Sequence, residues 1–467
     1  MNQSAVHTNR LRVLIIAEAC NPDWVSVPLA GWSHYNALRQ VVDPHLVTHP
    51  RNRGALLNQG LTEGEDFTVI NNEHVAKPMH RLASLLRGGK GKGWTTVMAL
   101  AWPAYWEFER LLWKHFRDDL RAGRFDLVHR LTPLTPTIPS RMATRCRRLG
   151  VPFVLGPLNG GVAWPAGFDN LRRKEREWLS YVRGGYRYLP AYRAMGRDAA
   201  AIICGSMATL EQMPDYCQDR CHYIPENAVD PERFDRVRTH TAQRPLKLAF
   251  LGRLVPYKGA DMLIDAVAPL IQAGRATLDI YGDGPERQAL SAQVRDLGLS
   301  DGVVLHGWIE HQEVSRRLAE SDVLASPSVR EFGGGVCLEA MAIGLCPVIA
   351  DYAGPAELVT TRTGIKVAMG GRQELIAGFR QAIERLADDP LQVDAFGRAG
   401  RERVHALFTW SRKAQQVTAI YDWVLGRTDD RPMMDRPWDD DAGTVRTPLP
   451  LAGPYNQPML PAPAEPA

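Results

Sequence analysis

The segment over residues 326–357 constrains the fold more than any other part of the chain. It places a glycine run, residues 333–335, before a helical pattern over residues 336–343 and an apolar strand over residues 346–350. Because glycine has no Cβ, a ligand can approach such a turn closely. The helix start that follows offers unpaired N–H groups and the positive end of a dipole to an anion. The segment therefore predicts an anion site at a turn of an α/β fold.

Two glutamates, Glu331 and Glu339, stand eight positions apart on either side of this glycine run. Glu339 lies one turn into the predicted helix, so it can point at the same ligand from the side. A carboxylate is a poor ligand for phosphate, but it accepts hydrogen bonds from sugar hydroxyls. The segment thus indicates a ligand that is both anionic and polyhydroxylated, such as a nucleotide sugar.

A second segment adds positive charge. Residues 246–254 have the pattern of a strand with Gly252 and Arg253 at its carboxyl end, and Lys258 follows before an amphipathic helix. In open α/β sheets, ligands bind outside the carboxyl ends of the strands. Arg253 and Lys258 would therefore project two cations into that crevice, where they suit a diphosphate.

Strand and helix patterns alternate along the chain, which predicts an α/β architecture with parallel sheets. In the first half, strands are expected at residues 13–17, 127–130, 151–155 and 201–204, with a long helical region at 94–121. A proline-punctuated polar run follows residue 221, and we place the boundary between a first domain (1–222) and a second domain (223–411) there. Pro, Asp and Arg dominate residues 427–467, so we expect a disordered tail.

Five short motifs in the second half resemble those of the retaining GT-B glycosyltransferases of family four, the group 1 glycosyl transferases. They are G-R-L-x(3)-K-G at 252–259, Y-G-D-G-P at 281–285, H-G-W at 306–308, E-x(7)-E-A-M-A at 331–342 and G-P-A-E at 354–357. One E-x(7)-E alone would be weak evidence, since two glutamates at that spacing are common by chance. Five pieces in order, spread over roughly residues 225–425, are a strong signal.

The resemblance implies two Rossmann-like domains that face a central cleft. The first would bind the acceptor and the second the nucleotide-sugar donor, with a helix over residues 412–426 crossing back to the first domain. It assigns Arg253 and Lys258 to the donor diphosphate and Glu331 to the hydroxyls of the transferred sugar. These three are the predicted catalytic residues. The predicted donor-binding residues are Gly31, Gly252, Gly334, Gly335 and Glu339, the last at the ribose hydroxyls.

Two further residues, His129 and Asn159, are predicted to line the acceptor or sugar cleft. His129 stands where relatives commonly carry His-x-His, but Leu131 replaces the second histidine, so a packed structural role for His129 is an equal alternative. Ala30 and Gly333 also depart from the pattern of relatives. For Glu331, the alternative is a loop carboxylate paired with its neighbour Arg330.

Composition narrows the class of protein. The charged (23%) and apolar (45%) fractions are typical of a soluble globular protein. The seven cysteines follow no disulfide framework, which favours reduced thiols in a cytoplasmic protein. Cys217 and Cys221 lack a second Cys/His pair, so we interpret them as structural. The folded region has no Asp-x-Asp motif, and we expect neither a cofactor nor a metal.

Charge is distributed unevenly along the chain. Residues 77–197 hold 23 Lys and Arg against 8 Asp and Glu, interleaved with tryptophans, whereas the whole chain carries only +4. Basic residues interleaved with aromatics suit an anionic membrane surface, so attachment at the inner face of the membrane is one expectation. A solvated basic face with core tryptophans and a phosphorylated acceptor are alternatives. No recognition motif supports nucleic-acid binding.

Together these features predict a retaining hexosyltransferase with a UDP- or GDP-linked sugar as donor. The acceptor would be a glycan or a lipid-linked molecule in exopolysaccharide or cell-envelope glycan synthesis. Front-face substitution without a metal is the expected mechanism, since two cations would carry the charge of the leaving phosphate. The alternatives are transfer to a small phosphorylated metabolite and a catalytically degenerate scaffold that binds nucleotide sugars.

Overall fold

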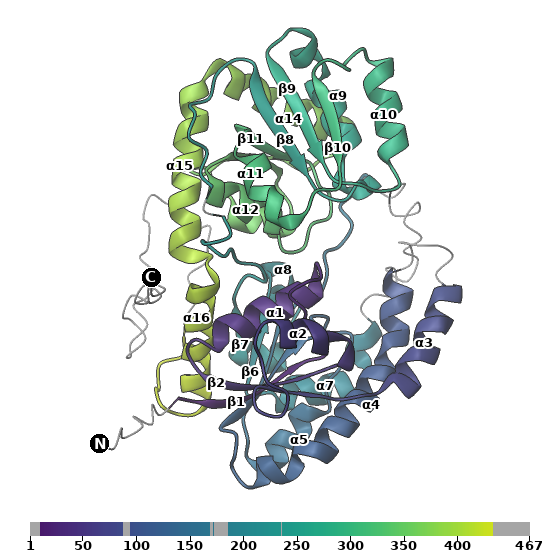
Figure 1. The fold of residues 1–467 in the computed structure, drawn as a ribbon, viewed down its shortest axis with the longest axis vertical. Helices are drawn as coiled ribbons and strands as arrows, with labels where there is room; N and C mark the ends of the chain where they lie inside the picture. Colours follow the sequence, from purple (N-terminus) through teal and green to yellow (C-terminus); the bar gives the residue numbers. More distant parts are fainter. Residues whose placement is uncertain (1–9, 87–93, 169–170, 172–184, 235, 433–467) are drawn as a thin grey trace.

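Two parallel sheets, one in each half of the chain, build the molecule. In this computed structural model, residues 10–86, 94–168, 171, 185–234 and 236–432 are described. The two halves lie one above the other in Figure 1, with the first sheet in the lower half. The predicted α/β fold with two Rossmann-like domains is confirmed.

The first sheet has seven parallel strands in the order β3-β2-β1-β4-β5-β6-β7. They are β1 Arg12–Ala17, β2 Asp43–Thr48, β3 Phe67–Val69, β4 Leu127–Thr132, β5 Phe153–Leu158, β6 Ala201–Cys204 and β7 Cys221–Tyr223. The helices are α1 Val27–Leu38, α2 Arg53–Asn58, α3 Glu73–Leu86, α4 Trp94–Arg121, α5 Met142–Leu149, α7 Pro190–Asp198 and α8 Met207–Glu211. Helices cover both faces, so the central strands β1 and β4 are almost wholly buried; β1 is apolar after Arg12, whereas β4 also buries three polar residues, His129, Arg130 and Thr132.

The second sheet has six parallel strands in the order β10-β9-β8-β11-β12-β13. They are β8 Leu246–Leu251, β9 Ala276–Tyr281, β10 Val303–Gly307, β11 Val323–Ser326, β12 Cys346–Ala350 and β13 Ile365–Val367. The helices are α9 Ala260–Gln272, α10 Arg287–Asp296, α11 His311–Leu318, α12 Gly335–Ile343, α13 Ala353–Leu358, α14 Arg372–Asp388 and α15 Pro390–Leu407.

The last helix, α16 (Trp410–Val424), returns to the first sheet. It packs on α1, and its residues Val417 and Tyr421 share a buried cluster with Val13 of β1. Figure 1 shows α15 along the upper half and α16 along the lower half. Beyond α16, the Arg431 guanidinium donates to the carbonyl oxygen of Cys221 at 2.6 Å. The rest of the predicted tail, 433–467, lies outside the described residues, and the four domain limits stay predictions.

In both sheets the order of the strands reverses at one point, between β1 and β4 in the first and between β8 and β11 in the second. Loops after neighbouring strands leave such a point on opposite sides of the sheet, so a crevice forms at the carboxyl edge. The fold therefore offers two such crevices, one for each half.

Two smaller observations concern the expected class of protein. None of the described helices is long and apolar enough to cross a membrane. All seven cysteines are buried free thiols. The Cys217 and Cys221 thiols donate to the backbone carbonyls of Pro214 and Cys217, both at 3.2 Å, as structural cysteines do.

Candidate functional site

The carboxyl ends of β8 and β11 bring together two of the predicted catalytic residues. Lys258, at the end of the turn after β8, forms an ion pair with Glu331, in the loop after β11. Only 18% and 23% of these side chains are exposed. Burial alone would lower the pKa of Lys258, but the adjacent Glu331 carboxylate outweighs it and the pKa is raised. The ammonium therefore keeps its charge in a mostly buried place.

Backbone contacts hold the two loops of this pair in register. The N–H of Val329 donates to the carbonyl oxygen of Tyr257 at 2.9 Å, and the Ser328 hydroxyl contacts the same oxygen at 3.3 Å. Gly259, next to Lys258, has a φ of 73° and leaves no room for a side chain, since a Cβ would lie 2.9 Å from the Pro327 carbonyl oxygen. The sequence places Lys258 and Glu331 far apart, and this packing of the turns makes them neighbours.

Arg253 differs from Lys258 in its surroundings. Its side chain is exposed and has no hydrogen-bond or ion-pair partner among the described residues. Gly252 before it donates its N–H to Tyr281 at 3.0 Å, and a Cβ on Gly282 would lie 1.9 Å from the Gly252 oxygen. The turns after β8 and β9 thus pack backbone on backbone, and Arg253 projects from their edge free to meet a ligand.

The glycine run before α12 packs tightly against its surroundings. Gly334 caps the helix with a φ of 59°, and a Cβ there would lie 2.8 Å from Leu358 of α13. A Cβ on Gly333 would lie 2.1 Å from the Asn227 side-chain nitrogen, so a larger residue here would have to displace that amide. Gly335 begins α12, and its N–H belongs to the first turn of that helix.

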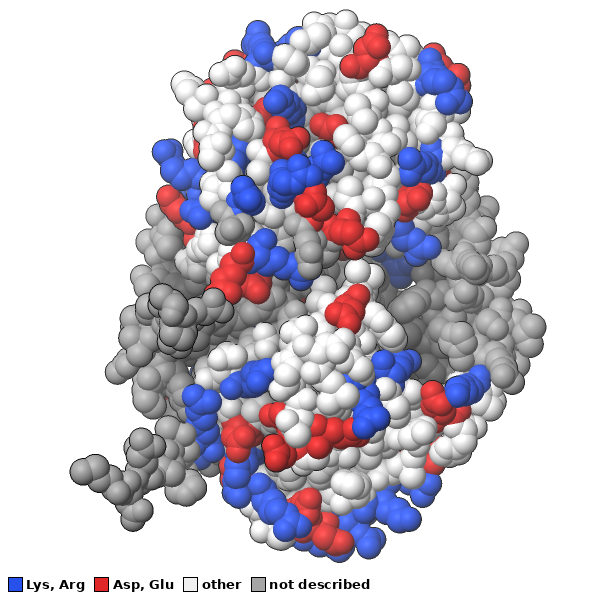
Figure 2. All heavy atoms as spheres, viewed as in Figure 1, with Lys and Arg blue, Asp and Glu red and all other residues white. Residues whose placement is uncertain are grey.

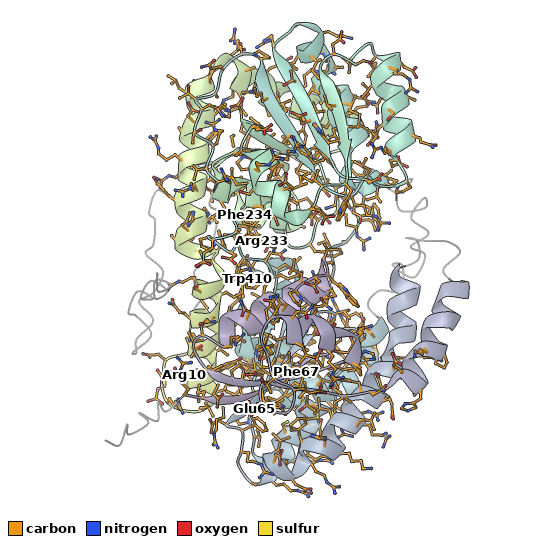
Figure 3. All side chains as sticks on the ribbon, in the orientation of Figure 1. Arg10, Glu65, Phe67, Arg233, Phe234 and Trp410 are labelled. Atoms are coloured by element: carbon orange, nitrogen blue, oxygen red, sulfur yellow. The ribbon has the colours of Figure 1, made fainter. Side chains whose placement is uncertain are left out.

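Glu339 lies half-buried in the second turn of α12. Arg233, on the segment between the two sheets, is close enough to feel its charge: burial lowers the pKa of Arg233 and Glu339 partly offsets this. Arg233 and Phe234 lie near Trp410 where the two halves meet (Figure 3). Glu339 is thus near the junction of the halves, on the same helix start as the glycine run.

The carboxyl edges of the two sheets face each other across this junction. After β5, the carbonyl oxygens of Val162 and Ala163 accept from Arg330 (3.4 Å) and Tyr352 (2.8 Å), which follow β11 and β12. After β6, the N–H of Met207 donates to the Glu357 carboxylate of α13 at 3.0 Å. A ligand held by one edge therefore meets the other.

Asn159 lies at this junction, and its predicted contact with the acceptor stays a prediction. Its amide donates to the carboxylate of Glu226, on the segment that joins the two sheets. Burial raises the pKa of Glu226, and the nearby charge of Glu331 adds to the effect. Lys413 of α16 is also near Glu226. The charge of Glu226 raises the pKa of Lys413, but burial has the larger effect and lowers this pKa to about 7. Sequence reasoning missed Glu226 and Lys413, since neither belongs to a motif.

Two predicted residues lie elsewhere. His129 of β4 is fully buried, and its ring nitrogens contact the Tyr421 hydroxyl (2.5 Å) and the Gly156 carbonyl oxygen (2.7 Å). Burial lowers its pKa to about 4, so it is a neutral, packed histidine and not a residue of the cleft. Gly31 lies inside α1 and not in a loop. A Cβ there would lie 2.3 Å from the Ala19 carbonyl oxygen, so α1 packs closely on the segment after β1, and the donor-binding role of Gly31 stays a prediction.

Comparison with known proteins decides the family. The family model "Glycosyl transferases group 1" matches residues 245–389. A mannosyltransferase of Mycolicibacterium smegmatis, named GDP-mannose-dependent alpha-(1-6)-phosphatidylinositol monomannoside mannosyltransferase, is 32% identical over 72% of this chain and 91% of its own. The chain belongs to the group 1 glycosyltransferases. Another relative, the 2-deoxystreptamine glucosyltransferase of Streptomyces kanamyceticus, is 30% identical over 60% of this chain and 73% of its own.

Solved structures support the fold of this group 1 glycosyltransferase. HepE from Anabaena in complex with UDP has a TM-score of 0.58 at 17% identity and covers 88% of this chain and 99% of its own. Sucrose-phosphate synthase from Thermosynechococcus elongatus has a TM-score of 0.60 at 17% identity, over 90% and 100%. At such identity the likeness shows the GT-B fold alone. The roles of the individual site residues, and the expectation that no metal takes part, stay predictions.

Proposed function

We propose that this group 1 glycosyltransferase moves a hexose, with retention of anomeric configuration, from a UDP- or GDP-linked sugar to a glycan or lipid-linked acceptor. The pathway would be exopolysaccharide or cell-envelope glycan synthesis. The observation that carries the proposal is the Lys258–Glu331 pair at the point where the strand order of the second sheet reverses. This is the place where an open α/β sheet binds its ligand.

Each residue of the pair would bind a different part of the donor. The donor diphosphate competes with Glu331 for the Lys258 ammonium, and Arg253 adds a second cation from the exposed edge. Glu331, released from Lys258, then accepts hydrogen bonds from the hydroxyls of the transferred sugar. Glu339 does the same for the ribose, and the first N–H groups of α12 face the diphosphate. Charge stabilisation in a mostly buried place is stronger than in water, which favours departure of the nucleotide.

The chemical step needs no nucleophile from the chain. The acceptor hydroxyl oxygen forms a bond to the anomeric carbon on the face that the phosphate leaves, while the bond from that carbon to the phosphate oxygen breaks. The proton of the hydroxyl passes to the departing phosphate oxygen. The protein positions the two substrates and stabilises the negative charge with Arg253 and Lys258 in place of a metal.

The acceptor has two candidate classes, because the relatives differ in what their names state. One name states a phosphatidylinositol mannoside, and the other states 2-deoxystreptamine, a small molecule. The basic first domain supports the lipid-linked class through attachment to an anionic membrane surface at the cytoplasmic face. Arg141, Arg148 and Tyr188 are exposed there. Figure 2 shows Lys and Arg side chains at the lower end of the molecule, with acidic side chains between them.

A thermal-shift panel of nucleoside diphosphates and their sugars, with EDTA present, tests the donor. A ligand that binds only the folded state raises the melting temperature. We expect one nucleotide family to do so with the wild type and much less with Lys258→Ala, whereas Lys247→Ala, at an exposed lysine of β8, serves as control. No shift with any nucleotide would overturn the proposed donor site. Flotation with anionic vesicles then distinguishes a membrane-attached enzyme from one that acts on free small molecules.

A further inference from the structure

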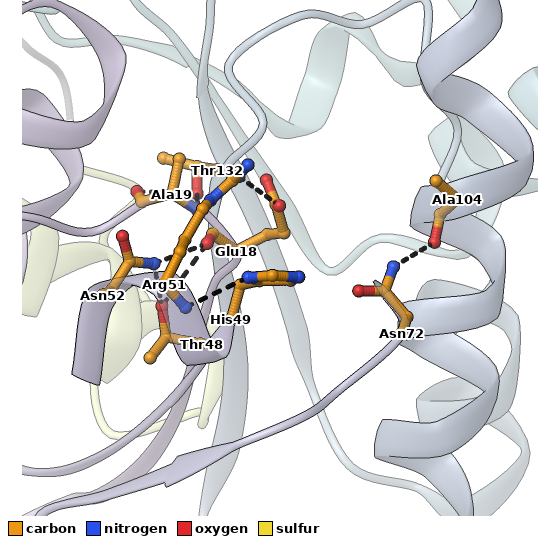
Figure 4. A network of polar contacts seen from close by, with 9 residues as sticks. All are labelled: Glu18, Ala19, Thr48, His49, Arg51, Asn52, Asn72, Ala104 and Thr132. Atoms are coloured by element: carbon orange, nitrogen blue, oxygen red, sulfur yellow. Dashed lines mark hydrogen bonds and ion pairs between the residues drawn. The ribbon is translucent and has the colours of Figure 1, made fainter. Parts of the chain in front are cut away.

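Polar side chains at the ends of β1 and β2 contact residues of their own half. They form the first-edge cluster, which consists of Glu18, Thr48, His49, Arg51, Asn52 and Asn72 (Figure 4). The Asn52 amide donates to the backbone oxygen of Glu18 at 2.9 Å, and the Asn72 amide donates to that of Ala104 in α4 at 2.7 Å. The segment after β5 differs from this cluster, because it crosses to the second half.

We call residues 159–168, which follow β5, the junction loop. Its start is fixed on the first half, where the N–H of Asn159 donates to the carbonyl oxygen of Leu134 at 2.6 Å. Its end is fixed in the second half, because Phe168 is only 3% exposed and belongs to a core cluster whose other buried residues all lie between positions 242 and 393. The junction loop therefore ties the first half to the second.

Trp164, in the middle of the junction loop, contacts two side chains of the second half. Its ring centre lies 5.0 Å from the guanidinium carbon of Arg330 and 6.5 Å from the ring centre of Tyr257, which it meets edge to face. The same guanidinium carbon lies 5.4 Å from the ring centre of Phe332. Both guanidinium distances are within the range in which a cation and an aromatic ring attract each other. One side chain of the first half thus packs against two loops of the second.

The two residues that Trp164 contacts are sequence neighbours of the Lys258–Glu331 pair. Tyr257 directly precedes Lys258, and Arg330 directly precedes Glu331. The carbonyl oxygen of Tyr257 also accepts hydrogen bonds from the loop after β11, so the two loops are joined beside the pair. Loss of the Trp164 ring would therefore release a side chain next to each member of the pair.

Backbone contacts on the junction loop give Trp164 a defined place. The carbonyl oxygen of Val162 accepts from Arg330 Nε at 3.4 Å, and that of Ala163 accepts from the Tyr352 hydroxyl at 2.8 Å. These two hydrogen bonds attach the residues just before Trp164 to the loops after β11 and β12. The ring therefore meets the second half in one arrangement, and its contacts exist only while the two halves are closed on each other.

We propose that Trp164 is a positioning residue that sets the geometry of the Lys258–Glu331 pair. It acts through Tyr257 and Arg330, so the pair reaches its working arrangement only when the two halves are closed. The inference rests on the proposed function, because it takes this pair to bind the donor. A misplacement of about 1 Å in a reacting group can lower a rate about a hundredfold, so such a role has a measurable effect.

Variants of the full chain test this role with UDP-glucose and GDP-mannose as probes and water in place of the acceptor. The water oxygen forms a bond to the anomeric carbon, the bond from that carbon to the phosphate oxygen breaks, and one proton of the water passes to the departing phosphate. Release of UDP or GDP gives kcat, and titration calorimetry gives the Kd of each nucleotide. Trp113→Leu is the matched control, since the guanidinium carbon of Arg145 lies 5.3 Å from the Trp113 ring centre within the first half.

We expect kcat in Trp164→Leu to fall at least about tenfold while the Kd of UDP or GDP changes less than about threefold, because the cations remain and only their arrangement is lost. Trp164→Phe keeps an aromatic face for Arg330, so it should retain at least about half of the wild-type kcat. Trp164→Leu combined with Arg330→Met should be no slower than the less active single variant, because both changes remove one contact.

Two further measurements cover a variant that does not fold and a reaction that is too slow. Arg330→Lys keeps the charge but not the planar guanidinium, so it should show a smaller fall in kcat than Arg330→Met and replaces Trp164→Leu if that variant does not fold. If the wild type hydrolyses neither donor at a measurable rate, the ratio of the Kd of the nucleotide sugar to that of the nucleoside diphosphate serves instead. Trp164→Leu should raise this ratio, because Glu331 contacts only the sugar.

Four outcomes would overturn the inference. The first is a Trp164→Leu variant with a lower melting temperature but wild-type kcat and Kd ratio, as expected of a loop that only covers the junction. The others are an equal loss in Trp113→Leu, an equal loss in Trp164→Phe, and independent losses that multiply in the double variant. A wild type that binds neither donor would refute the proposed function together with the inference, whereas a wild type that binds donor and an unaffected Trp164→Leu would refute the inference alone.

Discussion

The two carboxyl edges of the molecule use different chemistry at the same position of the same kind of sheet. The second edge combines a glycine run, a helix start and a mostly buried Lys258–Glu331 pair. The first edge has a Glu18–Arg51 pair, in which Arg51 is 42% exposed and Glu18 23%, and a buried His49 whose pKa is lowered to about 4. The second edge thus combines a helix start with two cations, Arg253 and Lys258, whereas the described ends of β1 and β2 at the first edge present one paired cation and no glycine run.

The difference also lies in how each edge tolerates change. At the second edge, a Cβ added to Gly259, Gly282 or Gly334 would lie less than 3 Å from a neighbouring atom. At the first edge, side chains provide the hydrogen-bond donors and acceptors, and several types of polar residue carry such atoms. The second edge is therefore expected to tolerate fewer substitutions than the first.

The largest effect expected is from Lys258→Ala at the second edge. Turnover should fall by more than about tenfold, since the change removes a charge from the place where the leaving phosphate develops its own. Initial rates at saturating donor measure it, and Lys247→Ala, at an exposed lysine of β8, is the control. Near-wild-type turnover in Lys258→Ala would break the comparison, because the second edge would then carry no catalytic charge.

Arg253→Ala tests whether the second, exposed cation of the second edge serves ligand binding and not stability. The side chain is exposed and has no hydrogen-bond or ion-pair partner among the described residues, so its loss should leave the melting temperature unchanged while kcat/KM falls about tenfold through weaker diphosphate binding. Rates and thermal melts of the same preparation measure both. Arg295→Ala, at an exposed arginine of α10, controls for loss of surface charge. A lowered melting temperature with full activity would make Arg253 a structural residue.

How far the sequence predicts the fold depends on the pattern of each strand. Apolar runs such as Cys346–Ala350 and Ala201–Cys204 are predicted at their observed bounds, as is the helix Trp94–Arg121. β2 and β3 were missed because β2 begins Asp-Pro-His and β3 has only three residues. Such strands are defined by pairing with a neighbour and not by their own composition.

The candidate site also has a part that local sequence predicts and a part that depends on the packing of distant segments. The motif predicts that Lys258 and Glu331 serve one ligand, and the structure places them in contact. Glu226 and the first-edge cluster could not be predicted, since their residues come together only through the packing of separate loops. For His129 the sequence left a cleft residue and a packed histidine as equal alternatives, because a strand-end histidine has the same local sequence in both cases; the structure shows it packed against Tyr421.

At the first edge, Tyr421→Phe separates stability from catalysis. The change leaves the buried His129 Nδ1 without a partner, which should lower the free energy of unfolding by about 1–3 kcal/mol and leave the KM for the acceptor unchanged. Urea unfolding and acceptor kinetics measure the two quantities. Tyr281→Phe, a buried tyrosine with no hydroxyl partner among the described residues, is the control. A changed acceptor KM with unchanged stability would return His129 to the cleft.

The smallest effect is expected at Glu357, which joins the two edges. Burial raises its pKa to about 7, only partly offset by hydrogen bonds from Met207 and Tyr223. The folded state holds this proton more tightly than the unfolded state, whose carboxyl titrates near 4.5. The stability that Glu357 contributes is therefore present below pH ~4.5 and is lost as the pH rises through about 7.

Glu357→Gln cannot ionise, so it should match the wild type near pH 5 and melt a few degrees higher at pH 8. Melting temperatures across this range measure it, with Glu320→Gln at an exposed glutamate as control. If the variant instead melts lower at pH 8, the ionised carboxylate holds the two halves together through the N–H of Met207. The junction would then close more firmly as the pH rises, and the two edges would have to be treated as one pH-dependent unit.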